Sequence, residues 1–214
     1  MSIGKAIRKI LGEKLFKVIG KYYKAFFFNL EIFLETFPDI KPGSVLLDIG
    51  GGEGDPINYL LKKYQNINVI MLDISEKIGT FLDEKNKDKV KTFPKTSVNN
   101  FCKMNQPKPD YILIIDVLHH IRKEDRNEFF NDIKTLIHGN KCKIIIKDNE
   151  PGYCKTKLGY WADVYISGDK NTNLVSKEEL VKFMKSEFRN LKYYETNLFK
   201  LNKPNYSFVF SVNN

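Results

Sequence analysis

The sequence has few cysteines and no long hydrophobic run. Its 214 residues include three cysteines, Cys102, Cys142 and Cys154, which are too few and too scattered for a disulfide framework or a thiolate metal site. We therefore predict reduced thiols and no metal. No stretch of about 18 apolar residues exists, which argues against a transmembrane helix. Residues 1–5 lack the apolar core of a secretory signal peptide, so we expect a cytoplasmic protein.

Arginine is also scarce, so the net positive charge by itself says little about function. The chain has 35 Lys and Arg residues against 26 Asp and Glu residues, a net charge of +9, but only 4 of the cations are arginine. A lysine excess of this kind accompanies an AT-rich coding sequence and indicates little about function. Its position is more informative, because residues 1–24 hold seven cations and one acid, a net charge of +6.

Apolar residues recur at steps of three and four from Ile3 to Phe37, which predicts one long or broken amphipathic helix over residues 3–36. We treat residues 1–38 as a helical extension and residues 39–214 as the main domain. The basic extension has several interpretations. It could cover a substrate cleft, lie on an anionic membrane surface, contact an anionic acceptor or a second subunit, or simply face solvent. The oligomeric state stays open.

From residue 39 onward, short continuous apolar runs alternate with amphipathic stretches, as in strands buried on both faces of a parallel sheet. The expected strands are residues 45–47, 69–72, 90–93, 111–115, 144–146, 190–199 and 206–212. The expected helices are residues 56–65, 76–86 and 123–138, and one that a capping box opens at Ser176. This order predicts an α/β fold: a doubly wound, mainly parallel seven-stranded Rossmann-like sheet with an antiparallel C-terminal hairpin.

A glycine loop follows the first expected strand, where residues 48–54 read Asp-Ile-Gly-Gly-Gly-Glu-Gly. Such a loop lets the backbone approach a ligand at the carboxyl ends of the strands. Asp73 ends the second strand, about 20 residues on, where it can accept hydrogen bonds from ribose hydroxyls. Asp55 stands where a dinucleotide-binding loop needs its third glycine and would oppose a pyrophosphate. S-adenosylmethionine (SAM), which is cationic and lacks phosphate, suits this loop better than a dinucleotide.

Three segments resemble the motifs of class I SAM-dependent methyltransferases: residues 45–54, 71–75 and 110–121. The last is similar to members that methylate small molecules, and the resemblance covers about residues 40–214. It implies SAM as cofactor, with S-adenosylhomocysteine (SAH) as product. The implied cofactor-binding residues are Asp48, Gly50, Gly52, Gly54, Asp73, Ile74, Ser97, Val98, Asp116 and Val117. Asp48 would lie near the amino group of the cofactor and Asp73 at its ribose. Residues 95–99 lack the acid that many members place near the adenine.

Methyl transfer to a hydroxyl requires alignment and a base that removes the proton. His119 and His120 follow the fourth strand, at the edge of the sheet that faces the cofactor. We expect at least one of them, His119 before His120, to be the base, with Asp148 or Glu150 as an acid that orients it or binds a polar acceptor. The alternative is that one histidine only packs against the following helix. With a candidate base present, an oxygen acceptor is favoured over a nitrogen acceptor.

Candidate substrate contacts follow the fifth strand. Lys147 could hold an anionic acceptor, such as a phosphorylated or sugar-derived compound, and Glu150 a polar one. The segment 151–175 is long for a connection and carries the single tryptophan, as in a functional lid. Its aromatic residues Tyr153, Trp161 and Tyr165 are candidate walls of a substrate site, or else ordinary packed side chains.

These observations predict a SAM-dependent methyltransferase of a small molecule. One alternative is a membrane-surface methyltransferase of a lipid or quinone-like acceptor, and another is a noncatalytic SAM-binding partner or sensor domain. A dehydrogenase ranks third. The chain has neither an Asn/Asp-Pro-Pro-aromatic motif after the fourth strand nor a Pro-Cys pair, so a nucleic acid is not an expected partner.

Overall fold

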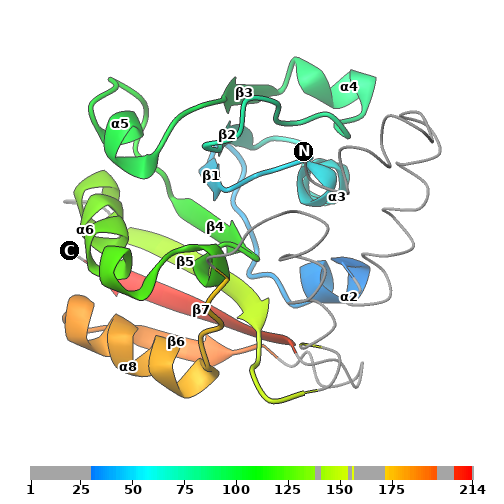
Figure 1. Ribbon diagram of the computed structural model, residues 1–214. Helices are drawn as coiled ribbons and strands as arrows, with labels where there is room; N and C mark the ends of the chain where they lie inside the picture. Colours follow the sequence, from blue (N-terminus) through cyan, green and yellow to red (C-terminus); the bar gives the residue numbers. More distant parts are fainter. Residues whose placement is uncertain (1–29, 138–140, 154–155, 157–171, 197–204, 214) are drawn as a thin grey trace, which may run out of the picture.

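The computed structural model describes residues 30–137, 141–153, 156, 172–196 and 205–213. Within them, seven strands form one sheet in the order β3-β2-β1-β4-β5-β7-β6 (Figure 1). The first five strands pair in parallel, while β7 lies antiparallel between β5 and β6. The predicted α/β fold with a closing antiparallel strand pair is therefore confirmed. The helical extension expected before residue 30 lies outside the described residues.

The elements keep most of the expected bounds. The strands are β1 (Val45–Ile49), β2 (Asn68–Leu72), β3 (Val90–Phe93), β4 (Tyr111–Ile115), β5 (Lys141–Asn149), β6 (Lys192–Glu195) and β7 (Asn205–Asn213). The α-helices are α2 (Leu30–Glu35), α3 (Asp55–Lys63), α4 (Glu84–Lys87), α5 (Val98–Cys102), α6 (Arg126–Ile137) and α8 (Lys177–Glu187). Two 3₁₀ turns, η1 (Leu118–His120) and η2 (Lys123–Asp125), precede α6. None of the helices among the described residues has the length and apolarity needed to cross a membrane.

The helix expected over residues 76–86 is wrong, since residues 76–83 form bends and turns and the short helix α4 begins only at Glu84. Its backbone bonds the glycine loop instead of itself: Gly79 N–H donates to Gly52 O at 2.8 Å, and Phe81 N–H donates to Glu53 O at 2.8 Å. Gly79 also has a φ of +65°, which ends any helix there. Tertiary hydrogen bonds thus replace the local helical pattern and give the loop a second layer of support.

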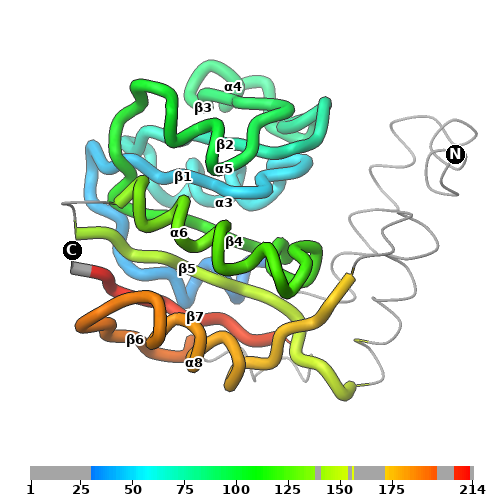
Figure 2. Tube along the Cα trace, turned by 60° about the vertical axis from the view of Figure 1, so that its left-hand side comes forward, coloured from blue at the N-terminus to red at the C-terminus, as the bar shows by residue number. Residues whose placement is uncertain are grey.

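Apolar side chains cover both faces of the sheet, which explains why its strands are continuous apolar runs. One face packs on α5, α6 and α8, for example through Phe101, Phe130 and Met184. The other face packs on α2 and α3, through Phe33 and Ile57. Figure 2 shows the sheet between these layers, from β3 at the top to β6 at the bottom.

Parallel pairing fixes the position of the candidate site. The carboxyl ends of β1, β2, β4 and β5 lie at one edge of the sheet because these strands run in the same direction. Ligands of open α/β sheets bind at this edge. The glycine loop, Asp73, Asp116 and Asp148 are therefore brought to one place.

Helix α2 belongs to the core of the domain. The Phe33 side chain has 0% exposure and contacts the Phe37 ring edge to face, with ring centroids 5.0 Å apart. We expect Phe33→Ala to lower the free energy of unfolding by about 3–5 kcal/mol, because it leaves a cavity between α2 and α3. Urea denaturation measures this change, with the exposed Glu35→Ala in the same helix as control. Equal stability of both variants would show that α2 is not part of the core.

Candidate active site

The glycine loop is held by the carboxylate of Asp73. Gly50, Gly52 and Gly54 have φ values of +72°, +49° and +88°, so the loop depends on glycine. Gly52 N–H donates to Asp73 Oδ2 at 3.0 Å, and Ser75 N–H donates to Asp73 Oδ1 at 2.7 Å. A carboxylate can accept about four hydrogen bonds, so Asp73 keeps capacity for the hydroxyl groups of a ligand.

Two predicted neighbours lie directly against the loop. A Cβ atom at Gly50 would lie 2.4 Å from Val117 Cγ2, and one at Gly51 would lie 2.8 Å from Asp48 Oδ2. Side chains at either position would collide with residues that end β1 or follow β4. The structure therefore brings Asp48 and Val117 to the glycine loop.

Asp48 is a buried acid, and one of its carboxylate oxygens has an unsatisfied hydrogen-bonding capacity. Its side chain is 3% exposed, and its Oδ2 atom has no hydrogen-bond partner among the described residues. Burial, with a smaller contribution from Asp73, raises the pKa of Asp48 from 3.8 to about 7. A buried oxygen of this kind lacks the donor that would favour its charged form. An ammonium group bound at the loop would supply one.

The residues expected near the adenine of the cofactor, Ile74, Ser97 and Val98, have different environments in the structure. Ile74, directly after Asp73, is 79% exposed and offers an apolar surface at the edge of the sheet. Ser97 Oγ accepts Asn100 N–H at 3.2 Å and caps α5. The Val98 side chain is in the core, so it offers no side-chain contact to a ligand.

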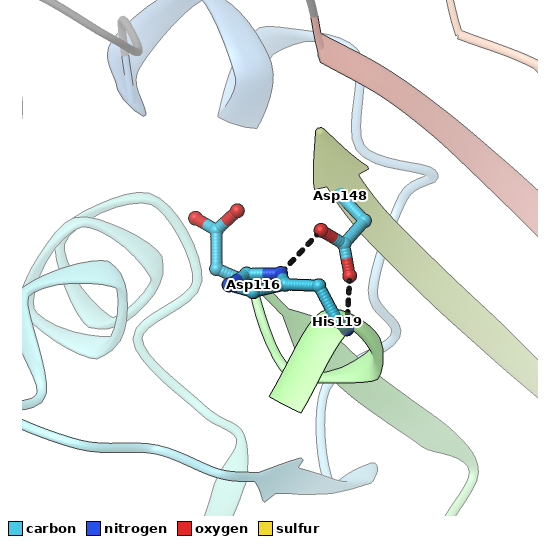
Figure 3. Close-up of side chains that lie close together, drawn as sticks. All are labelled: Asp116, His119 and Asp148. Carbon is cyan, nitrogen blue, oxygen red and sulfur yellow. Dashed lines mark hydrogen bonds and ion pairs between the residues drawn. The ribbon is translucent and has the colours of Figure 1, made fainter. Parts of the chain in front are cut away.

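His119 and Asp148 form a buried pair after β4 and β5 (Figure 3). His119 Nδ1 lies 2.6 Å from Asp148 Oδ1, and His119 backbone N–H donates to Asp148 Oδ2 at 3.2 Å. Burial raises the pKa of Asp148, but the charge and hydrogen bond of His119 outweigh it and hold the pKa below its ordinary value. Because an ionised carboxylate only accepts, Nδ1 carries the ring proton, which makes Nε2 the basic nitrogen.

Asp116 and Lys147 form a second pair beside the first. Lys147 Nζ donates to both carboxylate oxygens of Asp116, at 2.6 and 2.8 Å, and Asn149 Nδ2 donates to one of them at 3.3 Å. Asp116 has a φ of +54°, a strained conformation for a residue other than glycine. The Lys147 side chain is buried, and the carboxylate of Asp116 balances its charge.

The same cluster contains atoms suited to a metal. Asp116, His119 and Asp148 offer ligand atoms within 4.8 Å of one another. Figure 3 shows the two carboxylates on either side of the histidine. However, the Lys147 ammonium already supplies a positive charge to both oxygens of Asp116. A metal ion bound to Asp116 would have to displace this ammonium group.

The other predicted contacts lie apart from this cluster. Glu150 Oε2 accepts Lys177 N–H at 3.0 Å, so this acid holds the start of α8 and does not reach His119. The exposed His120 ring lies against that of His119, with centroids 4.0 Å apart. Tyr153 is 52% exposed. Trp161 and Tyr165 lie outside the described residues.

Sequence reasoning missed two polar residues near the pairs, Asn149 and Ser207. Asn149 contacts Asp116, and Ser207 lies opposite Lys147 in the pairing of β5 with β7. Ser207 is fully buried. The signal for Ser207 was a small polar residue within the apolar run Tyr206 to Phe210. Counted by alternation, Ser207 shares a face of the sheet with the buried Val209.

This architecture defines a class: an open α/β sheet with a glycine loop after its first strand and acids at the ends of neighbouring strands. Residues 47–140 match the family described as a methyltransferase domain. This match agrees with the resemblance to class I SAM-dependent methyltransferases seen in the motifs of the chain. No curated protein sequence matches the chain.

Solved methyltransferase structures share the fold at low sequence identity. One is N,N-8-amino-8-demethyl-D-riboflavin dimethyltransferase from Streptomyces davawensis, with a TM-score of 0.68, 13% identity, and coverage of 94% of this chain and 58% of that chain. Human N-acetylserotonin methyltransferase in complex with SAM has a TM-score of 0.64, 16% identity, and coverage of 87% and 52%. A SAM-dependent methyltransferase from Archaeoglobus fulgidus has a TM-score of 0.62, 18% identity, and coverage of 95% and 96%. The chain thus spans little more than half of the first two.

The raised pKa of Asp48 implies a pH-dependent stability. The native pKa is about 7 and the unfolded value about 3.8, so ionising Asp48 destabilises the native state as the pH rises between these values. At 1.36 kcal/mol per pKa unit, the loss above pH 7 is at most about 4 kcal/mol. We expect Asp48→Asn to be more stable than the wild type at about pH 8 and nearly equal to it at about pH 4.

Urea denaturation at the two pH values measures this difference, with Asp83→Asn, an exposed acid, as control. A variant that is less stable than the wild type at the higher pH would show that the Asp48 carboxylate is well solvated or paired.

Proposed function

We propose that the chain transfers the methyl group of SAM to a hydroxyl oxygen of a neutral small molecule. The observation that carries this proposal is the buried His119–Asp148 pair at the edge of the sheet that also holds the glycine loop. The named acceptor types of two structural neighbours, an aminoriboflavin derivative and N-acetylserotonin, support the choice of a small molecule.

The loop and its acids suit the charge of SAM. We assign the ammonium group to Asp48, whose buried Oδ2 would gain a cationic donor. The ribose hydroxyls are assigned to Asp73, and the adenine to the apolar surface of Ile74 and the backbone at Ser97 and Val98. Asp116 and Val117 would close the site on the β4 side, where Val117 already contacts Gly50.

His119 is assigned the proton of the acceptor. When bound, SAM supplies an electrophilic methyl carbon on a sulfonium, and the acceptor oxygen attacks it as the C–S bond breaks and its electron pair returns to sulfur. His119 Nε2 takes the hydroxyl proton. Asp148, which binds both the ring and the backbone of His119, fixes the tautomer and stabilises the imidazolium that forms.

The Asp116–Lys147 pair bears on the charge of the acceptor. Sequence reasoning assigned Lys147 to an anionic acceptor, but its ammonium contacts both oxygens of Asp116. An anionic acceptor would compete with this carboxylate and lie near Asp148. The arrangement therefore favours a neutral acceptor over a phosphorylated or sugar-acid one.

Asp73 tests the cofactor assignment. We expect Asp73→Ala to weaken the binding of SAH by at least about tenfold, because it removes both the anchor of Gly52 and the acceptor for the ribose. Isothermal titration calorimetry measures the affinity. Glu76→Ala is the control, since this nearby acid pairs with Lys95 at the surface. Unchanged affinity in Asp73→Ala would refute the assignment, and no binding by the wild type would refute the function.

Variants of the two neighbouring histidines test which of them is the general base. We expect His119→Ala to lower kcat by about 10²- to 10⁴-fold with SAH affinity retained. Asp148→Asn should behave similarly, because the buried amide would no longer hold the Nδ1 tautomer. His120→Ala, at an exposed ring, should keep most of the turnover. Steady-state kinetics across a panel of hydroxylated small molecules measures these values.

Full activity of His119→Ala would remove the general-base role and point to an acceptor that needs no deprotonation, such as an amine. SAH binding by the wild type without turnover of any acceptor would favour the noncatalytic sensor.

A further inference from the structure

The face of the sheet covered by α2 becomes polar toward the carboxyl end of β5. In the pairing of β5 with β7, Ile145 lies opposite Val209 and Lys147 lies opposite Ser207. Directly opposite residues project from the same face of a sheet, and alternate residues of a strand share that face. Ile145 and Val209 belong to the cluster that contains Phe33 of α2. Lys147 and Ser207 therefore continue this face where its apolar packing ends.

The Ser207 side chain has a buried hydroxyl group whose hydrogen-bonding capacity is unsatisfied. The residue has 0% exposure, and its Oγ atom has no hydrogen-bond partner in the described part of the chain. Its backbone is fixed, because its carbonyl oxygen accepts Thr196 N–H at 2.8 Å. Buried polar atoms are almost always hydrogen-bonded, so this hydroxyl has an unused hydrogen-bonding capacity that an ordered water or a ligand group would satisfy.

The position of Ser207 indicates the acceptor as its ligand. The order β2-β1-β4-β5-β7 places the cofactor acids Asp48 and Asp73 on one side of Asp116 and places Ser207 on the other. Lys147, which lies opposite Ser207, is paired with Asp116, so these two charges balance each other. A neutral group can bind Ser207 without breaking that pair, whereas an ionised group would be buried without a counter-charge.

We propose that Ser207 recognises the acceptor through a hydrogen bond to a neutral hydroxyl or carbonyl group, in a subsite completed by Asn149 and the Asp116–Lys147 pair. This assignment rests on the proposed function and names the chemistry of its second substrate. Ser207 is a binding residue, distinct from the proton transfer at His119.

Ser207→Ala tests the proposal on the SAH-saturated protein. The probes are benzyl alcohol and benzamide, which are neutral and polar, with toluene and benzoate as apolar and anionic counterparts. In ligand-detected NMR titrations, we expect the wild type to bind the two neutral polar probes better than toluene or benzoate. Ser207→Ala should weaken the binding of these two probes by about three- to tenfold and leave toluene unchanged.

Ser211→Ala is the matched control, since Ser211 lies on the same face of β7 but opposite Lys143, away from the site edge. Thermal denaturation supplies a second measurement. Losing an unsatisfied hydroxyl should leave the Tm of Ser207→Ala equal to that of the wild type or higher.

Two binding results would overturn the subsite: no preference of the wild type for the neutral polar probes, or equal affinities of these probes for the wild type and Ser207→Ala. A fall of several degrees in Tm would assign the hydroxyl a structural partner and also overturn it. Failure of the wild type to bind SAH would instead refute the proposed function, so the two failures are distinguishable.

Discussion

Parallel pairing of β1 with β2 and with β4 places the carboxyl ends of these strands at one edge of the sheet. Every group of the site depends on this arrangement. The bond from Gly52 N–H to Asp73 joins the ends of β1 and β2, and the contact of Val117 with Gly50 joins those of β1 and β4. Since β5 pairs in parallel with β4, Asp148 reaches His119. The site is therefore a property of the sheet topology, although its residues are far apart in sequence.

This edge also concentrates features that destabilise a ligand-free protein. Asp48 is a buried acid with an unmatched oxygen, Asp116 has a left-handed backbone, and Ser207 buries an orphaned hydroxyl. Each costs on the order of 1–3 kcal/mol, so the apolar layers on both faces of the sheet must offset them. Those layers contain two clusters of buried hydrophobic side chains, one on each face. Polar groups that lack partners lie where ligands are expected to provide them.

The sequence predicted the sheet well because buried parallel strands are continuous apolar runs, as in Tyr111–Ile115. It also predicted the glycine loop, Asp73 and the histidines, since each directly follows a strand. It failed over residues 76–86, where hydrogen bonds to Gly52 and Glu53 replace a helix. The sequence could not show which acid after β5 contacts a histidine. In the structure, Asp148 contacts His119, whereas Glu150 accepts a hydrogen bond from the first residue of α8. Whether the Ser207 hydroxyl has a hydrogen-bond partner depends on residues distant in the sequence, so no local sequence pattern predicts it.

The Asp116–Lys147 pair and the His119–Asp148 pair have different electrostatic roles in the proposed site. Lys147 balances Asp116 at all times, because neither group takes part in the proposed proton transfer. In the proposed proton transfer, Asp148 would stabilise the imidazolium that forms on His119. If Lys147 were directed at Asp148, it would cancel the charge that makes His119 basic. The hydrogen bonds of Lys147 to Asp116 thus leave the two oxygens of Asp148 to the ring and backbone of His119.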